Sequence, residues 1–200
     1  MDFDDLIFAK EPPPNRIGKA DCEFEHHLYE GAVMVAYAMH LLRTQPTNEV
    51  RIHPDGEHGK QFDFSGWLAR RGFLSVSRSG KTSYGGTYTD GEGRTIIVNP
   101  KSGLGDVVTE ANNQTISAEC KGGIINTRHS GQVARLYKGL CETVGLLMAT
   151  PSKGRQVAVV PYTATTFKLA NRLAPRCALA GIELALVKSQ GEIIDIRVSN

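Results

Sequence analysis

Residues 105–123 read GDVVTEANNQTISAECKGG and predict a β-hairpin. Apolar and polar residues alternate in two runs, and Asn112 and Asn113 stand between them. Asparagine tolerates a positive φ angle, so this pair suits the two-residue loop of a tight hairpin. With that loop, the register predicts that Val107 lies opposite Ala118.

The same register places two carboxylates directly across the hairpin from each other. Asp106 lies opposite Glu119, and Lys121, two residues further on, shares the face of Glu119. Opposed side chains have Cβ atoms about 4.5–5.5 Å apart, where like charges are destabilising unless something neutralises them. A divalent cation would neutralise this pair.

The pattern Gly105-Asp106 followed by Glu119-Cys120-Lys121 resembles the PD-(D/E)XK nuclease superfamily. This resemblance implies that Asp106 and Glu119 hold Mg²⁺, with Mn²⁺ as a substitute, and that the Cys120 carbonyl is a further ligand. It also implies that Lys121 orients or activates the attacking water and stabilises the charge that develops on phosphorus. The alternative is an ordinary salt-bridged strand face.

Two acidic residues on predicted helices compete to complete the metal site. Residues 59–63, GKQFD, resemble the helix before the core sheet in the restriction and Holliday-junction-resolvase branches of the superfamily, where Glu follows Phe. Here the residue is the shorter Asp63, and Glu30 on an earlier predicted helix is its rival. The resemblance also places Gln132 near the metal and the scissile phosphate, although the Tyr that one branch has four residues later is Leu136 here.

A long amphipathic helix is predicted over residues 128–149. Apolar residues recur at three- and four-residue spacing, from Val133 to Met148. Arg128, Arg135 and Lys138 lie off this stripe and would give a basic face that steers phosphates toward the acidic pair.

A second basic segment lies in residues 77–93, which are rich in Gly, Ser, Thr and Tyr. Residues 79–82, SGKT, lack the glycine that a phosphate-binding P-loop has four positions earlier, so a solvent-exposed loop is expected. Positive charge beside aromatic rings favours contact with a nucleic-acid backbone, and the residues in question are Arg78, Lys81, Tyr84 and Tyr88.

The remaining elements follow from periodicity and breakers. Residues 1–20, with three consecutive prolines, are expected to form an irregular arm, and residues 21–43 a helix whose glutamates 23, 25 and 30 complement its dipole. Strands are predicted at 49–53, 73–76, 94–98, 156–160, 182–187 and 193–198, and helices at 61–71 and from 163, the latter interrupted near Pro175.

The predicted order of elements makes one α/β domain over residues 1–200, with a mixed central sheet flanked by helices. The resemblance implies a restriction-endonuclease-like core. The hydrophobic content of 40% suits a single core, and the net charge of +2 requires a local basic patch for any nucleic-acid partner. All four cysteines are expected to be buried thiols.

We therefore expect a Mg²⁺-dependent endodeoxyribonuclease, with DNA as its partner and a homodimer favoured for cutting both strands of a duplex. No apolar run is long enough to cross a bilayer, so a cytoplasmic protein without membrane contact is expected. One alternative is a non-catalytic nucleic-acid-binding or assembly subunit that keeps the nuclease fold. Another, less favoured, is a metal enzyme based on His26, His27, His53 or His58, which lack helical ligand spacing.

Overall fold

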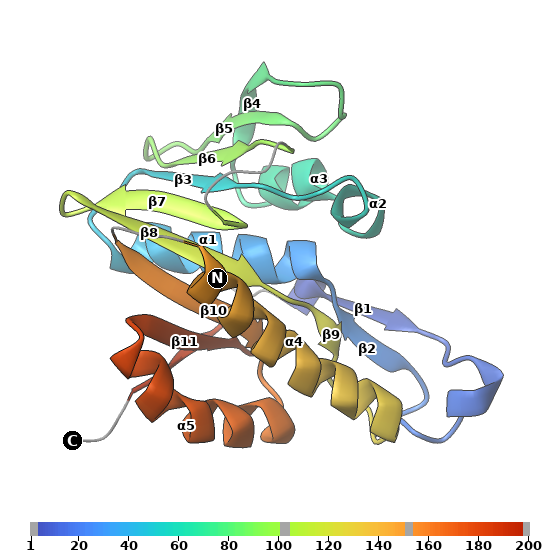
Figure 1. The fold of residues 1–200 in the computed structure, drawn as a ribbon. Coiled ribbons are helices and arrows are strands. Elements are labelled where there is room, and N and C mark those ends of the chain that lie inside the picture. The colour runs from blue at the N-terminus through green and yellow to red at the C-terminus, as the bar shows by residue number, and fades with distance from the viewer. Residues whose placement is uncertain (1–3, 101–104, 151–153, 198–200) are drawn as a thin grey trace.

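The computed structural model describes residues 4–100, 105–150 and 154–197 and shows a mixed α/β fold. Its largest feature is a sheet in which β10 is parallel to β8 and β11, and β3 is parallel to β6, while the other neighbours are antiparallel (Figure 1). In spatial order its strands are β12 (Ile193–Ile196), β11 (Ile182–Val187), β10 (Arg155–Pro161), β8 (Gln114–Cys120), β7 (Val107–Ala111), β3 (Glu49–Ile52), β6 (Thr95–Val98), β5 (Gly86–Thr89) and β4 (Leu74–Arg78).

Helices cover both faces of this sheet, which confirms the α/β class. Helix α1 (Glu30–Thr44) packs on one face, and α4 (Ser130–Ala149) and α5 (Ala164–Leu179) pack on the other (Figure 1). Strand β10 shows the division, because Val157 and Val159 join the core under α1 while the alternate residues join the core under α4 and α5. From Val157 onward this two-sided strand is apolar, as its sequence predicted, and its polar residues are confined to the start.

The β7–β8 hairpin is confirmed in detail. Asn112 and Asn113 have φ angles of 52° and 58°, which is the conformation of a type I′ turn. The register pairs Val107 with Ala118 and Thr109 with Ile116.

The N-terminal region differs from the sequence prediction. Within the expected irregular arm, β1 (Ile7–Lys10) is a strand that lies between two short 3₁₀ turns, η1 (Asp4–Leu6) and η2 (Pro14–Arg16). The first part of the expected helix is instead β2 (Glu25–Leu28), which pairs with β1 and with β9 (Gly123–Ile124) in a small three-stranded sheet. Only the second part of that segment is helical, as α1.

Glu25 explains part of this difference. Its side chain does not complement a helix dipole, because it is almost fully buried on β2 and accepts two hydrogen bonds from Arg16, at 2.7 and 2.9 Å. Pairing with strands far along the chain therefore overrides the local helical pattern. Of the three glutamates assigned to the helix start, Glu30 is the one in the first turn of α1.

Three further elements differ from expectation. The helix predicted at 61–71 is two pieces, α2 (His58–Gln61) and α3 (Phe64–Ala69), because Asp63 caps the second. Strand β5 lies inside the predicted loop. Helix α5 continues through Pro175, since the burial of residues such as Ala174 and Cys177 against the sheet offsets the lost hydrogen bond.

The apolar stripe of α4 is also rotated from its predicted position. Gln132, Leu136, Leu140, Thr143 and Leu147 are its buried residues, whereas Tyr137, Cys141 and Met148 are exposed. Of the four cysteines, Cys120 and Cys177 are buried, but Cys22 and Cys141 are exposed, so the expectation of four buried thiols was wrong. Within the described ranges, no helix is both long and apolar enough to cross a membrane.

Candidate functional site

An acidic pair lies where β7 begins and β8 ends. Asp106 directly precedes β7, and its backbone N–H donates to Ala118 across the hairpin at 2.8 Å. Its carboxylate accepts a hydrogen bond from the backbone N–H of Cys120, also at 2.8 Å, and lies within hydrogen-bonding reach of the Glu119 side chain. The two carboxyl groups therefore interact, but the paired register ends at Val107 and Ala118, and Asp106 is a bend residue just outside it, so the pairing of Asp106 opposite Glu119 stays a prediction.

The surroundings favour protonation of this pair. Burial raises the pKa of the Asp106 carboxyl well above its usual range, and the charges of Glu119 and Glu30 raise it further against the opposing hydrogen bond from Cys120. Burial likewise raises the pKa of Glu119. Burial is thus the main cause of both raised pKa values, and the charge of Glu30 adds to it in each case.

Lys121 lies beside the pair and contacts two helices. Its Nζ is 3.3 Å from Oε1 of Glu30 in the first turn of α1 and 3.5 Å from Oε1 of Glu142 on α4. Gly139 on α4 lies next to this side chain, and a Cβ atom there would make ordinary van der Waals contact with the Lys121 Cβ at 3.4 Å. Burial would lower the pKa of Lys121, but the nearby carboxylates, Glu30 first, outweigh it and raise that pKa.

His58 completes the cluster. Its Nε2 lies 3.1 Å from Oε1 of Glu30. Burial would lower the pKa of His58, but its hydrogen bond with Glu30 and the charge of that carboxylate reverse the effect, so that pKa is raised. Sequence reasoning did not group His58 or Glu142 with the acidic pair, because neither shares a motif or an element with it. We call Asp106, Glu119, Lys121, Glu30, His58 and Glu142 the acidic cluster.

The two candidate helical acids lie in different surroundings. Glu30 belongs to the acidic cluster, where it contacts Lys121 and His58. Asp63 is exposed, and its carboxylate caps α3 by accepting hydrogen bonds from Gly66 N–H and the Ser65 hydroxyl. The known contacts of Asp63 are therefore those of a helix cap.

Gln132 is buried in the first turn of α4 and lines a separate cavity beside the acidic cluster. This cavity has a volume of about 240 Å³. We call it the basic cavity, and its lining residues are Arg16, His27, Tyr29, Gly122, Gly123, Ile124, Gln132 and Arg135. Sequence reasoning found Gln132 and Arg135 but missed the residues contributed by the N-terminal region.

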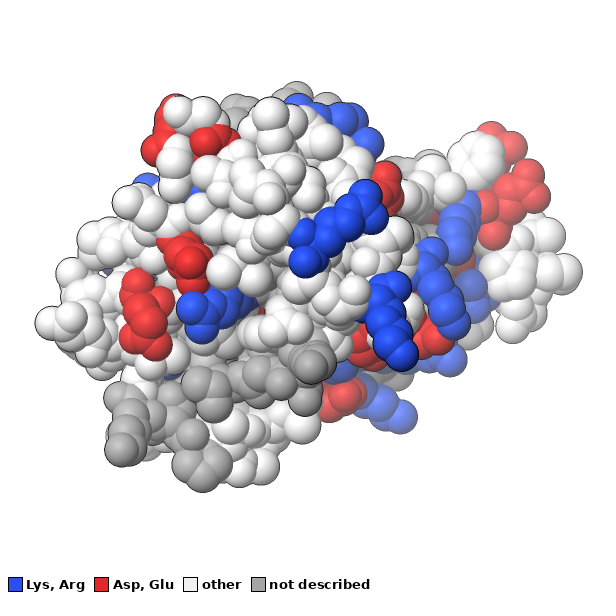
Figure 2. All heavy atoms as spheres, turned by 90° about the horizontal axis from the view of Figure 1, so that it is seen from above, with Lys and Arg blue, Asp and Glu red and all other residues white. Residues whose placement is uncertain are grey.

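The five basic residues proposed to bind nucleic acid are all exposed, at Arg78, Lys81, Arg128, Arg135 and Lys138. Arg128 is partly engaged, since it forms an ion pair with Asp21 and donates to the Ala20 carbonyl. Figure 2 shows Lys and Arg side chains gathered on the half of the molecule toward β1 and β2, with Asp and Glu among them. Tyr84 and Tyr88 are buried, so the expectation that their rings contact nucleic acid was wrong.

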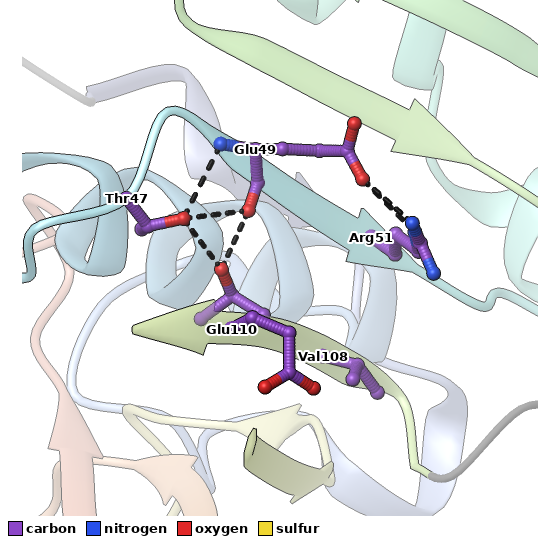
Figure 3. Close-up of a pocket in the computed structure, with 6 residues that line it drawn as sticks. Thr47, Glu49, Arg51, Val108 and Glu110 are labelled. Carbon is purple, nitrogen blue, oxygen red and sulfur yellow. Dashed lines mark hydrogen bonds and ion pairs between the residues drawn. The ribbon is translucent and has the colours of Figure 1, made fainter. Parts of the chain in front are cut away.

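A second pocket, of about 100 Å³, lies between β3 and β7 (Figure 3). Arg51 and Glu49 form an ion pair there at 2.8 Å, and Thr47 hydrogen-bonds to both Glu49 and Thr109. These polar groups therefore already bind one another within the pocket.

The four histidines of the alternative metal site do not converge. Across residues 4–100, 105–150 and 154–197, no group of three or more His, Cys, Asp or Glu side chains is arranged to hold a metal ion. His27 lines the basic cavity, and His58 belongs to the acidic cluster. His26 contacts Cys22, and His53 contacts the Asn99 carbonyl.

Comparisons with known proteins found no matching family model, no matching curated protein and no matching solved structure. The acidic cluster and the basic cavity are therefore the features of the molecule that indicate a function.

Proposed function

We propose that this chain is a Mg²⁺-dependent endonuclease that hydrolyses phosphodiester bonds in DNA. The observation that carries the proposal is the half-buried, interacting pair Asp106 and Glu119, where β7 begins and β8 ends, with Lys121 beside them. Structural ion pairs rarely place two carboxylates in contact, because their repulsion is costly without a cation.

The side chains present fit a hard divalent cation, since they offer carboxylate oxygens in a half-buried place. Asp106 and Glu119 would hold the ion, and the Cys120 carbonyl is a further ligand that the nuclease resemblance suggests. Glu30, which contacts Lys121 and His58, would have to turn from them to complete the set, because no three such side chains among the described residues are already arranged to hold a metal ion. When bound, Mg²⁺ lowers the pKa of a coordinated water and neutralises charge on the phosphate.

Lys121 has a narrower role than the resemblance allows. Its raised pKa keeps the ammonium protonated at neutral pH, so in this state it cannot accept a proton from water. It instead places a positive charge beside the acidic pair, where it stabilises charge that develops on a phosphate in the transition state.

The test is a cleavage assay on linear, supercoiled, single-stranded and four-way-junction DNA, with Mg²⁺ or with chelator. We expect cleavage that chelator abolishes and that Asp106→Ala or Lys121→Ala lowers by about 100-fold or more, as for loss of a group that stabilises transition-state charge. Lys188→Ala is the matched control, because nearby Glu192 is the one ion-pair partner of Lys188 among the residues that the structure describes. Wild-type rates in both Asp106→Ala and Lys121→Ala would contradict the proposal.

A second candidate is a non-catalytic nucleic-acid-binding or assembly subunit with a nuclease-like fold. The ion pairs of Lys121 with Glu30 and Glu142 favour it, because a lysine held in this way also serves as a structural link between β8, α1 and α4. DNA binding without metal and without hydrolysis of any of the four substrates would select this candidate.

Oligomeric state is part of the proposal. One acidic cluster per chain cuts one strand, so cleavage of both strands of a duplex favours a homodimer. Sedimentation of the protein with and without duplex DNA measures this directly, and a monomer in both conditions together with double-strand cleavage would contradict it.

A further inference from the structure

The basic cavity adjoins the acidic cluster through two pairs of consecutive residues. Tyr29 lines the cavity and Glu30 belongs to the cluster, while Gly122 lines the cavity and Lys121 belongs to the cluster. Consecutive Cα atoms lie about 3.8 Å apart, so a single extended ligand can reach both places. Gly122 makes the junction tight, because a Cβ there would lie 2.5 Å from both the Glu30 nitrogen and the Leu28 oxygen.

Positive charge predominates around this cavity. Arg135 is exposed at the cavity, and no ion-pair partner for it is found among the described residues. Lys10 holds its ammonium 5.1 Å from the centre of the Tyr29 ring. Glu25 brings a carboxylate to the lining, where Arg16 binds it through both oxygens, and it also lies 3.5 Å from His27 Nε2.

A tyrosine hydroxyl is left without a partner here. Tyr29 Oη is buried and has no hydrogen-bond partner within the described part of the chain. A buried polar group without a partner is destabilising, and native proteins usually satisfy such groups with a ligand or water. Gln132 adds an amide, and the first turn of the long helix α4 adds the positive end of its dipole.

We propose that the basic cavity binds a phosphate group of a nucleic-acid strand, next to the phosphate that the acidic cluster receives. Guanidinium, hydroxyl and amide donors around one small basic space are the groups that contact phosphate oxygens. The identity of the ligand as a nucleic-acid strand rests on the proposed function. The cavity would hold the strand in register while the acidic cluster acts on the neighbouring linkage.

The test measures binding apart from cleavage, by fluorescence anisotropy of a labelled single-stranded oligonucleotide in EDTA and in Ca²⁺. Tyr29→Phe removes only the unpartnered hydroxyl, so we expect thermal stability to be unchanged or raised and affinity to fall about fivefold to tenfold. Arg135→Glu should weaken binding by more than tenfold and lower the salt dependence by about one phosphate contact. Lys168→Glu, an exposed charge reversal on α5, is the matched control and should leave affinity within about twofold.

Two sources of phosphate are separated by using oligonucleotides with a 5′-phosphate or a 5′-hydroxyl end and by competition with inorganic phosphate. If the wild-type protein prefers the 5′-phosphate oligonucleotide and Tyr29→Phe abolishes this preference, the cavity binds a terminal phosphate. If the wild-type protein binds both oligonucleotides equally and Tyr29→Phe lowers both affinities, the cavity binds an internal phosphate. Both results support the cavity. Unchanged affinity in Tyr29→Phe, or no wild-type binding in either condition, would overturn it.

The outcomes also separate this inference from the proposed function. If cleavage depends on metal but Tyr29→Phe and Arg135→Glu bind the oligonucleotide like the wild type, the phosphate-binding cavity is rejected and the nuclease proposal is retained. If the two variants weaken oligonucleotide binding but no protein cleaves DNA, the phosphate-binding cavity is retained and the nuclease proposal is rejected.

Discussion

The β7–β8 hairpin and the small sheet of β1, β2 and β9 meet at Lys121 and Gly122, yet they form in different ways. The hairpin joins neighbouring segments through its own two-residue turn. The small sheet joins three distant segments, and its contacts include a hydrogen bond from His26 N–H to Asn126, 100 positions away. The hairpin carries the acidic pair and the small sheet carries much of the basic cavity, so one half of the site is locally encoded and the other is not.

The largest expected effect tests whether the distant acid, Glu30, joins the local pair. Glu30→Gln should lower cleavage by about 100-fold or more, because it removes a carboxylate that contacts Lys121 and His58. Asp63→Asn should leave cleavage within about twofold and stability unchanged, since Asn caps a helix as well as Asp. Cleavage rates of the two folded variants, measured in parallel, decide whether Glu30 or Asp63 completes the site. A large loss of cleavage in Asp63→Asn and none in Glu30→Gln would assign the site to Asp63.

The next effect is expected at the junction between the two regions. Gly122→Ala should lower the free energy of unfolding by about 3 kcal/mol, because its Cβ would lie 2.5 Å from the Glu30 nitrogen and the Leu28 oxygen, so the backbone of residues 28–30 must move away. Urea denaturation measures the change. Gly56→Ala is the control, since no atom lies within 4 Å of a Cβ there. Equal stability of the two variants would show that the junction is not tightly packed.

Within the small sheet, Glu25→Gln should cost about 2 kcal/mol, because it leaves Arg16 beside a buried neutral group. The hydrogen bond from Arg16 is the main cause that lowers the pKa of Glu25 below its ordinary 4.5. The stabilisation is therefore present above about pH 4.5 and is lost as the pH falls through the lower folded-state pKa.

Urea denaturation of the wild-type protein and of Glu25→Gln between pH 3 and pH 7 measures the difference in their free energies of unfolding. Glu57→Gln, which breaks an exposed pair with Lys60, should leave stability unchanged. A difference between wild type and Glu25→Gln that grows as the pH falls would contradict the assignment of the ion pair.

The smallest effect is expected at the hairpin turn. Asn113→Ala should destabilise by about 1 kcal/mol, because alanine disfavours the observed φ of 58°. Asn113→Gly should be neutral or slightly stabilising, since glycine suits the second position of a type I′ turn. Thermal melts of the two variants test this prediction, and equal loss in both would indicate that the asparagine side chain, rather than its φ angle, stabilises the turn.

The sequence by itself determined the hairpin, its register and the meeting of Asp106 with Glu119. These depend on a turn residue pair and on the alternation of side chains along adjacent segments, and both are local properties. The long helix α4, the buried strand β10 and the α/β class were also predictable, because each has a strong periodicity of its own.

Only the tertiary structure decided which helical acid joins Lys121, where His58 lies, and that the N-terminal segments form strands around a cavity. Lys121 and Glu30 are 91 positions apart, and β2 becomes a strand only because β1 and β9 supply its hydrogen bonds. Residues 21–29 read locally as the start of a helix, but pairing energy from distant strands and the ion pair between Arg16 and Glu25 exceed that local preference. Helix propensity differs by less than about 1 kcal/mol per residue, so contacts of this kind decide the outcome.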